Sequence, residues 1–126
     1  MTFRECINLL KGANIPNPEY DARELFIKFA PLSRGAAILD STESDSAALI
    51  SAVERRCARE PLQYIIGEVG FYRELYSVSP DCLIPRADTE ILVDFAVKNL
   101  GAGARFLDLC TGSGCIAIST LKNTRD

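Results

Sequence analysis

The residues best suited to chemistry lie in one run, 106–117, which reads Phe-Leu-Asp-Leu-Cys-Thr-Gly-Ser-Gly-Cys-Ile-Ala. This pattern predicts a buried strand over 104–109, then a glycine-rich loop, then the start of a helix. Such an arrangement brings backbone N–H groups and a helix N-terminus close to a nucleotide-like ligand. Asp108, at the carboxyl end of the strand, can accept hydrogen bonds from an amine or from the amides of the turn.

Three interpretations of this loop stay open on the residues alone. It can be a strand-to-helix turn that is capped by Ser113 and binds no ligand. Residues 112–117 also fit the G-x-G-x-x-G/A fingerprint of dinucleotide-binding domains, which predicts part of an NAD(P)-dependent oxidoreductase. The same run, shifted, fits the methyltransferase loop, hydrophobic-Asp-hydrophobic-Gly-x-Gly-x-Gly, with Cys110 in place of the first glycine. Asp108 before the loop favours the methyltransferase interpretation.

The composition is that of a globular domain and excludes several classes of protein. Of the 126 residues, 48% are hydrophobic and 25% are charged. The net charge of −3 offers no basic field, so we expect no direct contact with nucleic acid. No apolar run approaches the roughly 18 residues that cross a bilayer, and the N-terminus lacks the regions of a signal peptide, so we expect a cytoplasmic protein without membrane association. The five cysteines form no C-x-x-C pair and histidine is absent, so we expect no metal site.

The first sixty residues predict a run of helices. Thr2 and Glu5 have the spacing of a capping box, and Asn17 before Pro18 predicts the start of a second helix. A short helix is expected near 34–39, and Asp45 is expected to cap the next helix. The exposed side of that last helix carries charged residues that we interpret as a solvated face: Glu54, Arg55, Arg56 and Arg59.

The pattern changes after residue 60. Residues 62–67 predict one or two helical turns that end at Gly67, and the apolar residues that follow predict a β-hairpin. Asp88 or Thr89 is expected to cap a helix that runs to about residue 100. Arg86 has the spacing for an ion pair with Glu90, and Thr89 can be a simple N-cap, so neither residue is assigned to a site on spacing alone.

Four segments together resemble one known family. They are 59–67 (Arg-Glu-Pro-Leu-Gln-Tyr-Ile-Ile-Gly), Phe71-Tyr72, 83–90 (Leu-Ile-Pro-Arg-Ala-Asp-Thr-Glu) and 107–117. In order and spacing they resemble the HemK family, the peptide-chain release factor glutamine methyltransferases. The resemblance is weak over 1–58 and strong from 59 to 118. The Pro-Arg-x-x-Thr-Glu element joined to this loop is more specific than either piece alone.

The resemblance implies an α/β fold in three parts. These are a helical bundle for substrate recognition over 1–60, a short helix and β-hairpin linker over 61–87, and the start of a Rossmann-like methyltransferase domain over 88–126. It implies methyl transfer from S-adenosylmethionine to the side-chain nitrogen of the glutamine in the Gly-Gly-Gln motif of release factors. It also implies a cofactor-binding set, Asp108, Cys110, Thr111, Gly112, Ser113 and Gly114, and a set that positions cofactor and substrate, Leu83, Arg86, Thr89 and Glu90.

This sequence departs from the family pattern in two respects. The catalytic Asn-Pro-Pro-Tyr motif does not occur in it, so we expect no catalytic residue in these 126 residues. Cys110 replaces a glycine, which costs on the order of 1 kcal/mol if the position requires a positive φ and nothing if it has ordinary strand geometry.

Two further expectations concern the chain as a binding partner. The parallel partners of strand 104–109 are expected beyond residue 126. The strand should therefore pair with a second copy or pack onto the hairpin of a neighbour, and form a homodimer. Two alternatives to a methyltransferase stay open: the NAD(P)-dependent oxidoreductase, and a non-catalytic module that docks a protein partner.

Overall fold

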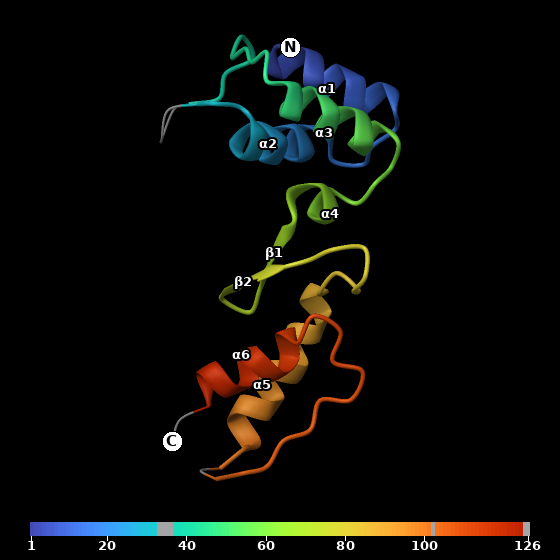
Figure 1. Cartoon of the computed structure of the whole chain (residues 1–126). Helices are drawn as coiled ribbons and strands as arrows, with labels where there is room; N and C mark the ends of the chain where they lie inside the picture. The colour runs from blue at the N-terminus through green and yellow to red at the C-terminus, as the bar shows by residue number, and fades with distance from the viewer. Residues whose placement is uncertain (33–36, 102, 125–126) are drawn as a thin grey trace. The chain divides into compact units, whose positions relative to one another are not determined.

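The computed structural model describes residues 1–32, 37–101 and 103–124. The chain divides into two compact units, Met1–Ile66 and Gly67–Asp126 (Figure 1). We call them unit 1 and unit 2. The three-part division expected from the sequence stays a prediction.

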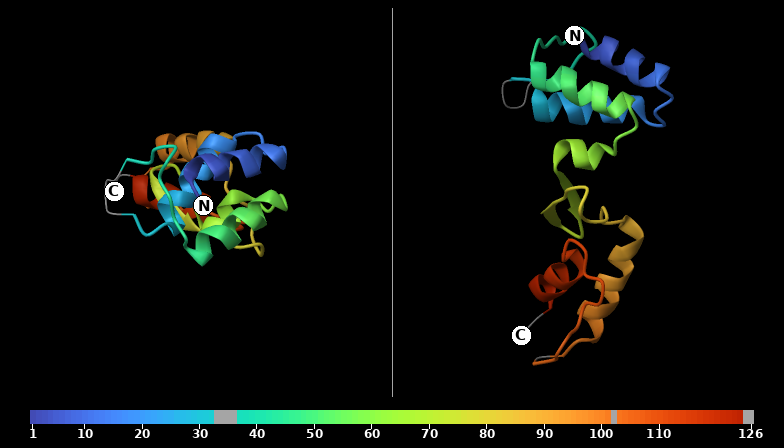
Figure 2. Two further views of the ribbon diagram at one scale, coloured as in Figure 1. Left: turned by 90° about the horizontal axis from the view of Figure 1, so that it is seen from above. Right: turned by 45° about the vertical axis from the view of Figure 1, so that its right-hand side comes forward.

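Unit 1 is helical. Its elements are α1 (Phe3–Gly12), α2 (Pro18–Phe29), α3 (Ala47–Cys57) and the short α4 (Leu62–Ile66). The first three lie side by side in both views of Figure 2. Their apolar faces meet in a core in which the rings of Phe3 and Phe26 pack edge to face, with centroids 5.3 Å apart.

Local sequence signals explain where these helices begin. The capping box of α1 is confirmed, because the Thr2 hydroxyl accepts the Glu5 N–H and the Glu5 carboxylate accepts the Thr2 N–H at 2.8 Å. Pro18 stands at the start of α2, as predicted. The predicted Asp45 cap of α3 is wrong: Ser46 is the N-cap, and its hydroxyl accepts the Leu49 N–H at 3.3 Å. Ser46 lies three residues before Leu49, which is the spacing a side-chain cap needs.

Two segments of unit 1 differ from the sequence-based expectation or lie partly outside the described residues. A short helix is expected near 34–39. Residues 33–36 lie outside the described residues, and residues 37–39 are not helical. The solvated charged face on α3 is wrong for Arg56, whose side chain is 15% exposed and lies 2.6 Å from the Asp21 carboxylate. This ion pair joins α3 to α2. Arg55, in contrast, pairs with Glu60 at an exposed site.

Unit 2 begins with the predicted hairpin, which is confirmed. Strand β1 (Glu68–Phe71) pairs antiparallel with β2 (Glu74–Ser77), with Phe71 opposite Glu74. The 3₁₀ turn η1 (Ala87–Thr89), α5 (Glu90–Asn99) and α6 (Cys115–Asn123) follow. A small core joins hairpin and helices; its buried members are Phe71, Tyr76, Val93 and Cys115.

The strand predicted over 104–109 is wrong. Residues 104–108 form no ladder within the described part of the chain, whose one sheet is the two-stranded hairpin. A β-strand needs a neighbour to satisfy its backbone groups, and no described segment offers one. Leu107 and Leu109 are therefore 76% and 78% exposed. The structure is thus mixed helix with a small antiparallel hairpin, and the predicted parallel sheet and the homodimer through this segment stay predictions.

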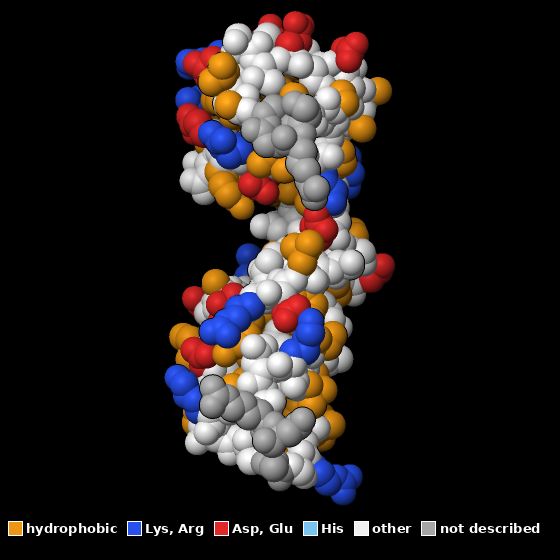
Figure 3. Space-filling model, turned by 90° about the vertical axis from the view of Figure 1, so that its left-hand side faces the viewer, with side chains coloured by type: hydrophobic (Ala, Val, Ile, Leu, Met, Phe, Trp, Pro, Cys, Tyr) orange, Lys and Arg blue, Asp and Glu red, His pale blue; other side chains and the backbone are white. Residues whose placement is uncertain are grey.

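On the face drawn in Figure 3, apolar and charged side chains are mixed in both units. No helix among the described residues is long and apolar enough to span a membrane.

Candidate functional site

Unit 2 contains a pocket of about 140 Å³ between the two segments that the sequence singled out. Residues 83–86 and Thr89 line one side, and residues 110–113, Cys115 and Ile116 line the other. The fold therefore brings the predicted residues Leu83, Arg86 and Thr89 together with Cys110, Thr111, Gly112 and Ser113. Three predicted residues lie outside this lining: Glu90, Asp108 and Gly114.

The glycine-rich loop places every second residue in left-handed backbone conformation. The φ angles of Cys110, Gly112 and Gly114 are 60°, 57° and 77°. Glycine adopts this conformation without strain, whereas a Cβ is disfavoured by roughly 1–2 kcal/mol. Of the two alternatives raised for Cys110, the structure therefore shows the one in which its side chain is unfavourable.

Asp108 holds the loop and α6 together. Its carboxylate accepts the Thr111 hydroxyl at 2.9 Å and the backbone N–H of Ala117 at 3.3 Å. Ala117 is in the first turn of α6, where free N–H groups and the helix dipole favour a negative charge. Gly114, the N-cap of α6, has no side chain that could do this. Asp108 thus caps the helix from outside it, and direct contact with a cofactor stays a prediction.

The 83–90 segment divides between the pocket and the hairpin. Ile84 is buried and anchors the segment, while Leu83 is 73% exposed at the pocket. Thr89 is the N-cap of α5 but makes no capping hydrogen bond with its side chain. Glu90 accepts the backbone N–H of Tyr72 at 2.9 Å. None of the ion pairs between described residues joins Glu90 to Arg86. Arg86 is the charged residue in the pocket lining.

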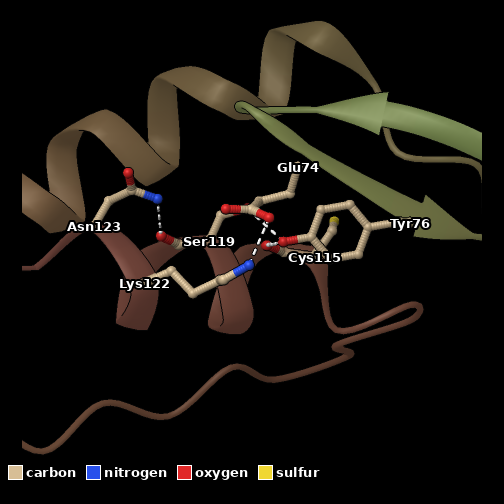
Figure 4. A network of polar contacts seen from close by, with 6 residues as sticks. All are labelled: Glu74, Tyr76, Cys115, Ser119, Lys122 and Asn123. Atoms are coloured by element: carbon tan, nitrogen blue, oxygen red, sulfur yellow. Dashed lines mark hydrogen bonds and ion pairs between the residues drawn. The ribbon is translucent and has the colours of Figure 1, made fainter.

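A polar network fixes α6 on the hairpin (Figure 4). The Tyr76 hydroxyl donates to the Cys115 carbonyl at 3.3 Å and shares a 2.6 Å hydrogen bond with the Ser119 hydroxyl. The Lys122 ammonium lies 2.6 Å from the Glu74 carboxylate, and this hydrogen bond raises the pKa of Lys122. These contacts join residues that lie 39 to 48 positions apart in the sequence.

Sequence reasoning missed part of the pocket. Ile84, Pro85, Cys115 and Ile116 also line it. Their signal was available, because each lies within one of the two motifs already singled out. The Tyr76–Ser119 contact had no such signal, since neither residue belongs to a recognisable motif. Among the described residues, no group of three or more His, Cys, Asp or Glu side chains could hold a metal ion.

Comparison with known proteins agrees with these motifs. A family model described as the PrmC N-terminal domain matches residues 2–67, which is nearly the whole of unit 1. The chain belongs to this family. The release factor glutamine methyltransferase of Rhodospirillum rubrum is 42% identical over 89% of this chain, and that of Nitratidesulfovibrio vulgaris is 44% identical over 98% of it. The resemblance to the release factor glutamine methyltransferases is therefore confirmed.

These release factor glutamine methyltransferases are longer than the chain. It covers 36% of the Rhodospirillum rubrum protein and 44% of the Nitratidesulfovibrio vulgaris protein. A third relative, from Thermodesulfovibrio yellowstonii, is 48% identical over 65% of this chain, which covers 31% of that protein.

Proposed function

We propose that this chain is part of an enzyme that transfers a methyl group from S-adenosylmethionine to a release factor. The acceptor is the side-chain nitrogen of the glutamine in the Gly-Gly-Gln motif. One observation carries the proposal: the pocket joins the 83–89 segment to the 110–116 loop, the two elements that the chain shares in pattern with these methyltransferases. The names of the relatives support the same activity. Such an enzyme would act in the cytoplasm, where release factors work.

The loop fits one part of the cofactor. Thr111 and Ser113 offer hydroxyl groups. Gly112 leaves open space beside the backbone: the atom nearest to a Cβ placed there would be the Cys110 carbonyl oxygen, at 4.0 Å. The pocket volume of about 140 Å³ is smaller than the roughly 300–1,000 Å³ of typical small-molecule sites. We therefore assign residues 110–114 to one wall of the cofactor site, with Asp108 behind them.

When bound, S-adenosylmethionine supplies a methyl group on a positively charged sulfur. The residues of this chain bind and orient: the loop holds the cofactor, and Leu83, Arg86 and Thr89 line the side at which the glutamine would approach. Methyl transfer of this kind depends mainly on alignment of the reacting atoms and on exclusion of water. Exposed Leu83 contributes an apolar surface for that exclusion, and unit 1 contributes to recognition of the release factor.

A titration of the ¹⁵N-labelled chain, followed by NMR, tests the proposal. We expect S-adenosylhomocysteine to shift the amide signals of Gly112 and Gly114, even at millimolar affinity, and NAD to leave them unchanged. The variant Gly112→Ala forces a Cβ into left-handed backbone and should weaken binding. Gly101→Ala is its matched control, because Gly101 has neither a positive φ nor a neighbour within 4 Å.

The alternatives give different results in the same titration. Shifts with NAD alone would favour the NAD(P)-dependent oxidoreductase. No shift with either ligand, together with shifts in unit 1 on addition of a release factor, would favour the protein-binding module.

A further inference from the structure

The turn of the hairpin is strained and is held by α5. Tyr72 and Arg73 connect β1 to β2, and both have positive φ angles, 55° and 113°, although neither is glycine. Two-residue hairpin turns of this kind ordinarily use Asn or Gly, so the turn is strained. Two acids of α5 hold it: Glu90 accepts the Tyr72 N–H at 2.9 Å, and Asp94 accepts the Tyr72 hydroxyl at 2.8 Å. One residue of the hairpin is thus bonded twice to the first part of α5.

The second strand of the hairpin, β2, is attached to α6. Tyr76 in β2 is 7% exposed, and its ring packs edge to face on Phe71 with centroids 6.1 Å apart. Its hydroxyl bonds to the Cys115 carbonyl and to the completely buried Ser119 hydroxyl, both in α6. The Glu74–Lys122 ion pair continues this attachment one turn further along α6.

Both helices begin at the pocket. Glu90, the first residue of α5, directly follows the lining residue Thr89, and Cys115, the first residue of α6, is itself a lining residue. The hairpin therefore contacts α5 and α6 near their N-terminal ends, which are the ends that border the pocket. It does so through side chains that do not line the pocket.

We propose that the hairpin sets the spacing between the two sides of the pocket. In this proposal Tyr72 and Tyr76 are positioning residues: Tyr72 fixes the start of α5 and Tyr76 fixes the start of α6. Glu90 belongs to the first of these attachments and so acts through Tyr72. The attachments are independent of any ligand, and only the effect on cofactor affinity rests on the function proposed above.

The test uses the 126-residue chain and two variants of one contact. Tyr76→Phe removes the hydroxyl and keeps the ring against Phe71, and Ser119→Ala removes the partner. Amide hydrogen exchange of Gly114 and Ala117 is measured without ligand, because the Gly114 N–H donates to the Thr111 carbonyl at 2.9 Å and the Ala117 N–H donates to the Asp108 carboxylate at 3.3 Å. The dissociation constant of S-adenosylhomocysteine is measured by NMR titration. Tyr20→Phe is the control, because Tyr20 is a 58% exposed tyrosine in unit 1. Circular dichroism melting verifies that each variant is folded.

We expect both variants to speed exchange of the Gly114 and Ala117 amides and to raise the dissociation constant, each by about fivefold, the change that loss of one hydrogen bond commonly gives. The double variant should be no worse than the more affected single variant, because both changes remove the same contact. Tyr72→Phe should speed exchange around Thr89 instead.

Exchange of the Gly114 and Ala117 amides decides the inference. Folded variants that exchange there like the unchanged chain would overturn it, and would show that direct packing of α5 on α6 sets the pocket. If the unchanged chain binds no S-adenosylhomocysteine, the proposed function fails, and exchange still decides the role of the hairpin.

Discussion

The side chain of Cys110 works against the backbone that carries it. Its left-handed conformation disfavours a Cβ by roughly 1–2 kcal/mol, while glycine has about 0.4–1 kcal/mol more unfolded-state entropy to lose. We therefore expect Cys110→Gly to raise the free energy of unfolding of unit 2 by about 0.5–1 kcal/mol. Urea unfolding followed through NMR signals of unit 2 measures this. Cys110→Ala keeps the Cβ and should give no gain; an equal gain would show that the thiol, not the backbone, is unfavourable.

Single residues also show where sequence reasoning stops. The loop and its glycines could be predicted from type and spacing, because left-handed turns need glycine locally. Whether the Cys110 side chain raises or lowers stability could not be predicted, since this depends on a φ angle that the surrounding fold determines. Asp108 was expected to accept hydrogen bonds from the amides of the turn, whereas its bond to the Ala117 amide depends on how α6 turns back, nine residues later.

The start of α1 makes part of the stability of unit 1 depend on pH. The backbone N–H of Thr2, and then its hydroxyl, lower the pKa of Glu5 below its ordinary value of 4.5. The folded chain therefore binds this proton less readily than the unfolded chain does. The stabilisation is present above about pH 4.5 and is lost as pH falls through the lower, native pKa. We expect Glu5→Gln to destabilise the chain at pH 7 and to differ little from the unchanged chain at pH 3, as measured by urea unfolding.

Thr2→Ser is the control for this prediction, because serine keeps the capping hydroxyl and should preserve the pH dependence. A Glu5→Gln effect of equal size at both pH values would mean that the charge is not involved.

Helices α2 and α3 are joined by one nearly buried ion pair. The side chains of Arg56 and Asp21 are 15% and 8% exposed. Loss of one partner therefore leaves the other charge unpaired at a site where water can hydrate it only poorly. We expect Arg56→Ala to lower the free energy of unfolding by about 3 kcal/mol, and the apolar pair Arg56→Met with Asp21→Leu to recover most of it. Thermal melting of unit 1 measures both. A double variant no better than Arg56→Ala would indicate that Arg56 acts mainly through its bond to the Glu60 carbonyl.

Among the elements, those with local signals were predicted well and those that need distant partners were not. A capping box and a tight hairpin depend on residues a few positions apart, and both are present. The 104–109 strand had the right apolar pattern, but its formation requires a neighbouring strand, which the local pattern cannot specify.

The two units differ in how well they are packed. Unit 1 has a core to which α1, α2, α3 and α4 contribute, whereas unit 2 leaves many apolar side chains exposed, including Ile91, Phe95, Leu107, Leu109 and Leu121. Because apolar burial is the main favourable term in folding, we expect backbone amides of α1–α3 to exchange more slowly than those of α5 and α6. Hydrogen-exchange mass spectrometry of the chain measures this difference.

Residues 1–66 made alone provide the control and should keep the slow exchange of unit 1, because the residues of this core all belong to unit 1. Equal protection of both units in the chain would contradict the prediction.

The turn at Tyr72 and Arg73 also restricts how this sequence can diverge. Asparagine or glycine would adopt the positive φ angles more readily, but neither offers a hydroxyl to Asp94 or a ring beneath the Arg73 guanidinium, which lies 5.8 Å from the ring centre. Substitutions that ease the backbone therefore remove the attachment to α5. A lineage that replaces Tyr72 loses the partner of the acid at position 94, so positions 72 and 94 are expected to covary.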